Sequence, residues 1–353
     1  MGSTFVKRFF YDRNDQQLGS SELHVLLHGF HRHTLWLQIS PLATGNTPTM
    51  THNRAQAGGL DLGGTKIEAQ VFDPKWDLID QKRVATPQTY PELVTAIAGL
   101  IQWIETTYGG GLPIGIGAAG LIHPVTGRAL TANICASSQP LPADIKAAAQ
   151  RDVTYLNDCR ALALSEAVFG AGKGHRTVAS VILGTGIGGG LAFDGALPAG
   201  PTGTGGEFGH TSAPAALIAQ NGLPIFPCGC GRDGCIETYI SGAGLERLAL
   251  SLCGTQMSPP DIAAQRDTTA APVWAAWCAL VGDFLRNLIL TLDPDVIVLG
   301  GGLSSITGVA DALARATQDA QIEDFTVPPI VIAQGGAESG ARGAAYAAWQ
   351  AAQ

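Results

Sequence analysis

Residues 58–73 read GGLDLGGTKIEAQVFD, and residues 177–195 read TVASVILGTGIGGGLAFDG; these two stretches decide the fold. Each places a glycine-rich turn between two short apolar runs, a pattern that predicts a β-hairpin. Because the same design occurs twice, about 120 residues apart, it indicates that the chain contains two similar halves.

Outward from both hairpins, predicted strands alternate with predicted helices. The runs LPIGIGAAGLI at 112–122, VTYLND at 153–158 and VIVLGGG at 296–302 each join an apolar strand to a polar or glycine turn. Apolar residues at helical spacing predict helices in four segments, namely 91–109, 159–172, 272–292 and 338–353. This alternation predicts an α/β architecture with two layered sheets.

The composition excludes several classes of protein. Of the 353 residues, 46% are apolar and 14% are charged, which indicates a globular core and excludes disorder driven by charge. The net charge of −8 argues against nucleic acid as a partner, because phosphate contacts need clustered Lys and Arg. No apolar run reaches about 18 residues without Gly, Pro or a charge, so we expect no membrane span. The first residues lack the long apolar segment of a signal peptide, so a cytoplasmic protein is expected.

Residues 1–57 differ from the rest of the chain. Five of the eight histidines lie here, and the glycine-rich strand pattern starts only at Gly58. We expect an atypical N-terminal extension, and Met50 is a candidate for the true start of translation. Mass spectrometry of the native protein would contradict that start by detecting peptides from residues 5–45.

The loop 61–66, DLGGTK, contains groups that suit a phosphate. Adjacent glycines let backbone N–H groups turn toward one point, while Thr65 adds a hydroxyl donor and Lys66 a positive charge. Asp61 could hold a phosphate-bound Mg²⁺ through water. The alternative is an ordinary hairpin turn.

The loop 183–190, LGTGIGGG, has five glycines after a β-branched strand, which suits close approach to a polyphosphate. A third glycine turn at 300–302 follows the strand VIVL, so we expect one nucleotide between two halves. A dinucleotide site of the Rossmann type is disfavoured, because a strand and not a helix follows the loop. No GK[ST] ends the loop, so it is not a Walker P-loop.

Two further features carry chemistry. Asn157 and Asp158 end the strand VTYL, where a carboxylate could accept a proton from an attacking hydroxyl, although both residue types also favour a helix N-cap. Cys228, Cys230 and Cys235 lie within eight residues. These soft ligands, with nearby His210 as the fourth, favour a structural tetrahedral Zn²⁺ site over unrelated buried thiols.

The strings DLGGTK, LGTGIGGG, GEFGH, CGCGRDGCIE and VIVLGGG occur in an order that resembles the ROK sugar kinases, from about Gly58 to Gln353. The resemblance implies a two-lobed, actin-like ATPase (ribonuclease H-like) fold with an interdomain cleft. We expect a smaller α/β lobe at 58–156 plus 336–353. A larger α/β lobe with a zinc knuckle is expected at 157–335.

The resemblance also implies the roles of individual residues, with Asp158 as the base that takes the proton from the sugar 6-hydroxyl. The residues matched to sugar binding are Asn133, Asn157, Asp158, Glu207, His210 and Glu237. Those matched to ATP are Asp61, Gly63, Gly64, Thr65, Lys66, Gly184, Thr185, Gly186 and Gly301. The zinc ligands are His210, Cys228, Cys230 and Cys235, and the cofactors are ATP, Mg²⁺ and structural Zn²⁺.

Two stretches resemble bacterial N-acetylglucosamine kinases within this family. They are the 17-residue His-to-Cys spacer at 211–227 and ALTANICASSQPLPADI at 129–145. The alternatives are a fructokinase, a glucokinase or an N-acetylmannosamine kinase. The family's Gly-x-Pro-Gly turn reads GAAG at 117–120, and this missing proline bears on sugar specificity. A sugar-responsive regulator is disfavoured, because residues 1–57 are short for a winged helix. A homodimer is expected.

Overall fold

The computed structural model describes residues 55–336 and 339–353. The predicted N-terminal extension therefore lies outside the described residues except at 55–57, and so does the candidate start at Met50.

The first sheet has five strands in the order β3-β2-β1-β4-β7. β2 pairs antiparallel with both β3 and β1, whereas β1 pairs in parallel with β4 and β4 with β7. The predicted first hairpin is confirmed, with Leu60 opposite Ala69. The strands are β1 (Ala57–Leu62), β2 (Lys66–Phe72), β3 (Leu78–Ala85), β4 (Ile114–Ala118) and β7 (Thr154–Asn157). A small separate hairpin consists of β5 (Leu121–Ile122) and β6 (Ala129–Leu130).

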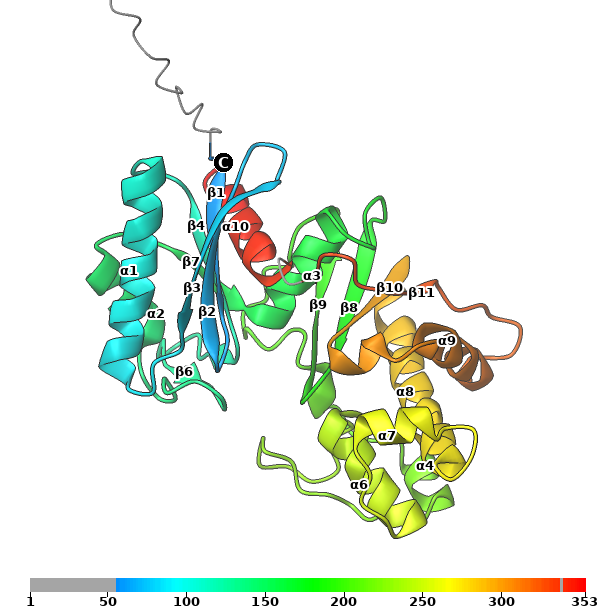
Figure 1. The fold of residues 1–353 in the computed structure, drawn as a ribbon. Coiled ribbons are helices and arrows are strands. Elements are labelled where there is room, and N and C mark those ends of the chain that lie inside the picture. Colours follow the sequence, from blue (N-terminus) through cyan, green and yellow to red (C-terminus); the bar gives the residue numbers. More distant parts are fainter. Residues whose placement is uncertain (1–54, 337–338) are drawn as a thin grey trace, which may run out of the picture. The chain divides into compact units, whose positions relative to one another are not determined.

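Helices pack against this sheet. α1 (Tyr90–Tyr108) packs against β2 and α2 (Leu141–Ala149), and their leucines and isoleucines form one core with the strands. α10 (Ser339–Ala351) packs directly on β1 and β4 (Figure 1). A Cβ atom on Gly59 or Gly115 would lie 1.9 Å from a backbone oxygen of this helix, so only glycine permits the contact.

The second sheet has four strands in the order β11-β10-β8-β9. Its strands are β8 (Thr177–Leu183), β9 (Ile187–Phe193), β10 (Val296–Gly300) and β11 (Ile330–Ile332). The predicted second hairpin, β8–β9, is confirmed, and β10 joins β8 in parallel. α3 (Asp158–Val168) packs on β8 and β9 and also on α10, so the two helices join the two sheets.

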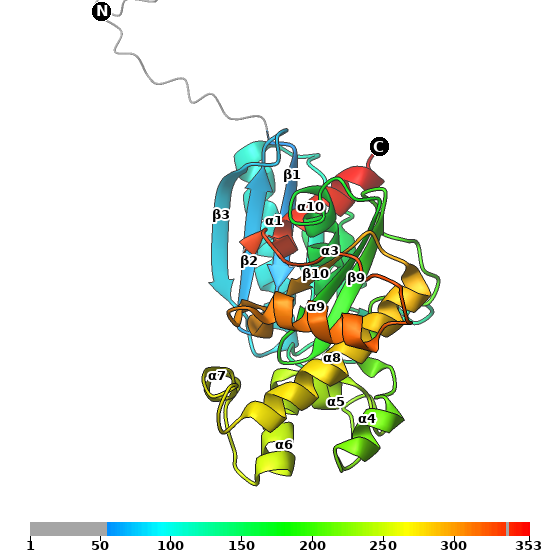
Figure 2. The same cartoon turned by 90° about the vertical axis from the view of Figure 1, so that its right-hand side faces the viewer.

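A helical region follows β9. Its central helix, α8, contacts α9 on one side and α4 to α7 on the other (Figure 2). By length and composition α8 could cross a membrane. However, 61% of its apolar 18-residue stretch is buried inside the protein, as in the core helix of a globular protein. The elements are η1 (Phe208–His210), α4 (Ala215–Gln220), α5 (Glu237–Ile240), α6 (Gly242–Cys253), α7 (Pro259–Ala264), α8 (Ala271–Leu292), η2 (Gly302–Ser305) and α9 (Val309–Ala320).

One prediction from the glycines is wrong in part. Gly188, Gly189 and Gly190 belong to β9 and not to a polyphosphate loop. A Cβ atom on Gly188 would lie 2.7 Å from the Cys159 sulfur, and one on Gly190 would lie 2.6 Å from the Cβ of Ala163. These glycines therefore let α3 approach the strand, and the turn itself is limited to 184–186.

Candidate active site

A pocket of about 230 Å³ lies between the two sheets. The first sheet contributes Asp61 and Lys66, and α3 contributes Asp158. The remaining lining residues are Cys159, Leu162, Ile182, Gly336 and Gly340. The pocket therefore joins the turn of the first hairpin to the end of β7, which are segments that the sequence separates by about 90 residues.

Asp158 is the first residue of α3, and its placement follows from the end of β7. Asn157 accepts hydrogen bonds from the N–H groups of Cys159 and Arg160, and its amide donates to the Gly120 carbonyl at 3.1 Å. Asn157 is thus the N-cap of the helix, and it also ties the 117–120 turn to the site. Its contact with a sugar stays a prediction.

Asp61 shares the pocket with a second carboxylate. Burial, and after it the charge of Asp158, raises the pKa of Asp61 from 3.8 to about 6, although Lys66 opposes the shift. Gly340, in the first turn of α10, lies against Asp61, since a Cβ atom there would be 3.1 Å from its carboxyl carbon. A pair of carboxylates that repel each other suits a cation between them.

We expect Asp61→Asn to stabilise the fold at neutral pH while it reduces activity. The folded state binds a proton at Asp61 more readily than the unfolded state, so the free energy of unfolding falls as pH rises from about 4 to about 6. The variant lacks that loss, and its unfolding free energy should exceed the wild type's by about 3 kcal/mol at pH 7.5. Urea unfolding without Mg²⁺ at pH 4.5 and 7.5 measures it. A variant no more stable than wild type at pH 7.5 would contradict the expectation.

Lys66 is held by a buried carboxylate. Its Nζ lies 2.8 Å from Oε2 of Glu68, and Arg83 binds the same oxygen at 2.8 Å. Burial acts to raise the pKa of Glu68, but hydrogen bonds from Lys66, Gln70 and Arg83 outweigh it and lower the pKa. Glu68 therefore orients Lys66 at the edge of the pocket.

Each of the two glycine turns is closed by a hydrogen bond within its own backbone. Gly63 donates its N–H to the Lys66 carbonyl at 3.0 Å and so closes the hairpin, as an ordinary turn would. Gly64 packs on Asn133, whose carbonyl would lie 2.7 Å from a Cβ atom at that position. In the second turn Gly184 donates to the carbonyl of Gly186 at 3.1 Å. Thr65 is exposed at the tip of the first turn.

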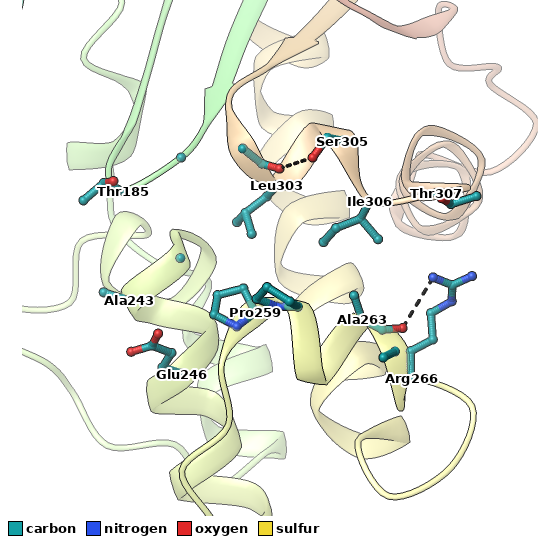
Figure 3. Close-up of a pocket in the computed structure, with 15 residues that line it drawn as sticks. Thr185, Ala243, Glu246, Pro259, Ala263, Arg266, Leu303, Ser305, Ile306 and Thr307 are labelled. Atoms are coloured by element: carbon teal, nitrogen blue, oxygen red, sulfur yellow. Dashed lines mark hydrogen bonds between the residues drawn. The ribbon is translucent and has the colours of Figure 1, made fainter. Parts of the chain in front are cut away.

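The second turn opens onto a larger pocket of about 810 Å³ (Figure 3). Gly184 and Thr185 line one side, and residues of α6, α7 and η2 line the others. Gly301 is the N-cap of η2 and has φ 85°, and a Cβ atom there would lie 2.5 Å from the Leu183 carbonyl. Motif reading missed most of this pocket, including Glu246, Pro259, Arg266 and Ser305, because these residues lie far apart in the sequence.

Four predicted zinc ligands come together. One ligand atom from each of His210, Cys228, Cys230 and Cys235 lies within 4.8 Å of the other three. The Cys228 sulfur is 3.6 Å from Nδ1 of His210, and the sulfurs of Cys230 and Cys235 are 3.6 Å apart. Three thiols and an imidazole at these separations fit one tetrahedral Zn²⁺.

The zinc cluster faces further acidic groups. With Nδ1 of His210 directed at the cysteines, Nε2 lies 3.6 Å from Oε2 of Glu207. Burial raises the pKa of Glu207, with His210 opposing and the charges of Asp158 and Glu237 adding to the rise. Glu237 begins α5, and its Oε2 accepts the N–H of Ile187 at 2.8 Å.

The pocket that Asp61 and Asp158 line and the Cys/His cluster share a neighbour in Cys159. Burial, and after it the charges of Asp158 and Glu207, raises the pKa of the Cys159 thiol. The site therefore combines a two-carboxylate pocket, a glycine turn that opens onto a large cavity, and a cluster of three thiols and one imidazole that fits a metal ion.

Comparison with known proteins agrees with this geometry. The ROK family profile matches residues 57–351. An N-acetylgalactosamine kinase from Shewanella sp. (strain ANA-3) is 39% identical over 292 residues, which is 81% of this chain and 94% of that protein. An N-acetyl-D-glucosamine kinase from Pasteurella multocida (strain Pm70) is 37% identical over 296 residues, which is 81% of this chain and 97% of that protein.

A solved structure shows the same likeness. The ROK family glucokinase from Streptomyces griseus, in complex with glucose and AMPPNP, superposes with a TM-score of 0.65 at 32% identity, covering 83% of this chain and 99% of that one. The fold and site define an α/β phosphotransferase of the actin-like ATPase class, as predicted. The chain belongs to the ROK family, and it is an enzyme of the sugar kinase type.

Proposed function

We propose that the protein transfers the γ-phosphoryl group of ATP to the 6-hydroxyl of N-acetyl-D-glucosamine. The observation that carries this proposal is the pocket between the two sheets, in which Asp61 and Lys66 face Asp158. Phosphoryl transfer requires positioning and charge neutralisation more than covalent chemistry, and this pocket offers both.

Asp158 acts as general base in the proposed reaction. Its carboxylate accepts the proton of the sugar 6-hydroxyl as that oxygen attacks the γ-phosphorus. The bond between the γ-phosphorus and the bridging oxygen breaks, and ADP leaves with that oxygen. Mg²⁺, when bound to the phosphates, neutralises their charge. Asp61, near the end of β1, holds that ion through water. Lys66, which begins β2 after the hairpin turn, contacts the phosphates.

The adenosine part of ATP is proposed to occupy the larger pocket. The cavity of about 810 Å³ begins at Gly184 and Thr185, so the phosphates pass along this turn from the cavity toward Asp158 (Figure 3). Gly186 and Gly301 are the remaining proposed nucleotide contacts.

The zinc ion is proposed to orient the sugar site. Binding of Nδ1 to the metal leaves Nε2 of His210 free to meet a sugar hydroxyl beside Glu207. Asn133, Asn157 and Glu237 are the other proposed sugar contacts. Asn133 is exposed, and Oδ1 of Asn157 already caps α3. The sugar must therefore supply the hydrogen-bonding group that completes each of these two contacts.

The identity of the sugar rests on the spacer between His210 and Cys228. In the structure this spacer contains the short helix α4, and its second residue, Ser212, forms a bridge with Cys235 of the cluster. N-acetyl-D-galactosamine is a second candidate, since the 39% identical relative is an N-acetylgalactosamine kinase. The two sugars differ only in the configuration at C4, so one hydrogen bond from a sugar-binding carboxylate could decide between them.

We expect N-acetyl-D-glucosamine to exceed the other sugars by about tenfold or more in kcat/KM. A coupled ADP-release assay with Mg²⁺ and ATP measures this across N-acetyl-D-glucosamine, N-acetyl-D-galactosamine, N-acetylmannosamine, glucose and fructose. Faster turnover of N-acetyl-D-galactosamine would assign the second candidate. Faster turnover of glucose or fructose would contradict the reading of the 211–227 spacer.

Three further predictions accompany the proposed activity. The enzyme is expected to act in the cytoplasm on a free sugar, and it is expected to form a homodimer. A role as a DNA-binding regulator is disfavoured by the net charge of −8 and by the presence of Asp158.

A further inference from the structure

Glu166 is a fully buried carboxylate in the last turn of α3, outside the pocket that Asp158 lines. Within residues 55–336 and 339–353, its two oxygens accept hydrogen bonds from Ala171, Gln334, Gly335 and Ser339. Oε2 accepts the N–H groups of Ala171 at 3.0 Å and Gln334 at 2.9 Å. Oε1 accepts the N–H of Gly335 at 2.7 Å and the hydroxyl of Ser339 at 3.0 Å. A buried carboxylate that accepts hydrogen bonds from several segments of the chain holds those segments in place.

Three of the four donors belong to the path between the two sheets. Residues 333–336, which we call the crossover, leave β11 of the second sheet, and Ser339 begins α10 on the first sheet. A Cβ atom on Gly335 would lie 2.7 Å from Oε1 of Glu166 and 2.0 Å from the Ser339 hydroxyl, so the crossover packs tightly on the carboxylate. Glu166 therefore fixes where the chain passes between the sheets.

The end of the crossover and the first turn of α10 form one wall of the pocket that Asp158 lines. Gly336 and Gly340 line the pocket together with Asp61 and Asp158, and Gly340 touches Asp61. The opposite wall begins at Asp158, the first residue of α3. Asp158 and Glu166 are eight residues apart on this helix, which is about 12 Å along its axis. The helix α3 thus carries both Asp158, the proposed base, and Glu166, which holds the opposite wall of the pocket.

We propose that Glu166 is a positioning residue for phosphoryl transfer, which holds the crossover so that Asp61 stands at the correct separation from Asp158. This inference rests on the proposed kinase function. Two of the residues proposed to bind the sugar, Asn157 and Asp158, lie at the far end of α3 from Glu166, and the others lie on other elements. Loss of Glu166 should therefore affect ATP and the chemical step more than sugar binding.

Glu166→Gln is the informative substitution because it preserves shape and removes acceptors. A carboxylate accepts at both oxygens, whereas the glutamine amide nitrogen donates and would face two of the present donors. Ser339→Ala removes a single donor and leaves the carboxylate, so its effect should have the same direction and a smaller size. If the two residues act together, the effects of the double variant will not add.

We expect Glu166→Gln to raise KM for ATP and lower kcat, each about tenfold, while KM for the sugar changes less than twofold. Steady-state kinetics with each substrate varied, together with calorimetry of Mg-ADP binding, measures this split. The control is Ile101→Val, in the buried core of α1 on the first sheet, assayed well below both melting temperatures. It should lower stability without moving either KM.

The outcomes separate this inference from the proposed function. Wild-type turnover with wild-type kinetic constants in Glu166→Gln would overturn the positioning role and leave the kinase proposal intact. Equal losses for ATP and sugar, matched by Ile101→Val at the same loss of stability, would also overturn it. Wild-type protein that phosphorylates none of the five sugars would contradict the proposed function, and weaker binding of Mg-ADP by Glu166→Gln would still support the positioning role.

Discussion

Asp158→Asn will lower kcat by about 10²–10⁴-fold, because the amide cannot accept the proton of the sugar hydroxyl. The loss should appear in kcat and in kcat/KM together, since proton transfer contributes only in the transition state. KM for ATP should stay close to the wild-type value, because the nucleotide contacts lie on the glycine turns and in the larger pocket.

The fold should survive this substitution. Oδ1 of Asp158 accepts the N–H of Cys159 at 2.9 Å, a bond that the asparagine oxygen can replace. The N-cap of α3 is Asn157, which the substitution leaves unchanged. Removing one of two facing carboxylates also relieves the repulsion that raises the pKa of Asp61. The melting temperature should therefore equal or exceed that of wild type.

Asp152→Asn is the matched control, because Asp152 is an exposed aspartate whose ion pair with Lys146 lies at the surface. It should keep full activity, since an exposed ion pair contributes little. Near-normal kcat in Asp158→Asn would refute the assignment of the base. A large loss of kcat accompanied by unfolding in circular dichroism would leave the fold, and not the base, as the cause.

The sequence predicted the parts of the fold that local pattern determines. Both hairpins, the α1 and α8 helices and the closing helix α10 follow from apolar periodicity and from Pro and Gly at their ends. The helix α2, which begins at Leu141, was not predicted. Pro140 stands at the N-cap without a side-chain hydrogen bond, so no common capping residue announces this helix.

Contacts between distant residues were beyond the reach of motif reading. Glu166 and Ser339 are separated by 173 positions, and no local pattern indicates that they meet. The same holds for the glycines of β9, whose purpose becomes clear only when α3 is seen packed against them. The zinc ligands were predictable because their chemistry is local, with three cysteines in one knuckle.

Cys230→Ser should release the zinc ion and destabilise the larger half of the protein. Wild-type protein should contain one zinc per chain by mass spectrometry of metals, and the variant much less, because a serine hydroxyl is a poor zinc ligand. Backbone contacts also hold the knuckle, among them the bridges Ser212–Cys235 and Pro227–Asp233. We expect a loss of about 3 kcal/mol in unfolding free energy, which corresponds to a melting temperature on the order of 10 °C lower.

Loss of the metal should also reach the sugar site. Without zinc at Nδ1, His210 is no longer oriented toward Glu207, so KM for the sugar should rise while KM for ATP changes little. This is the reverse of the split expected for Glu166→Gln, and the two variants therefore test different halves of the site.

Acid should weaken zinc binding in wild-type protein, because the thiols must lose their protons to bind the metal. Burial raises the pKa of Cys235 to about 12 in the metal-free state, so a proton competes with zinc there across the whole neutral range. Cys253→Ser is the matched control, since Cys253 lies outside the cluster with its sulfur 3.8 Å from the Thr269 carbonyl. Zinc content that is equal in Cys230→Ser and wild type, or absent from wild type, would contradict the site. Zinc lost from Cys230→Ser alone, together with a higher KM for the sugar, would establish that the metal orders the sugar pocket through His210.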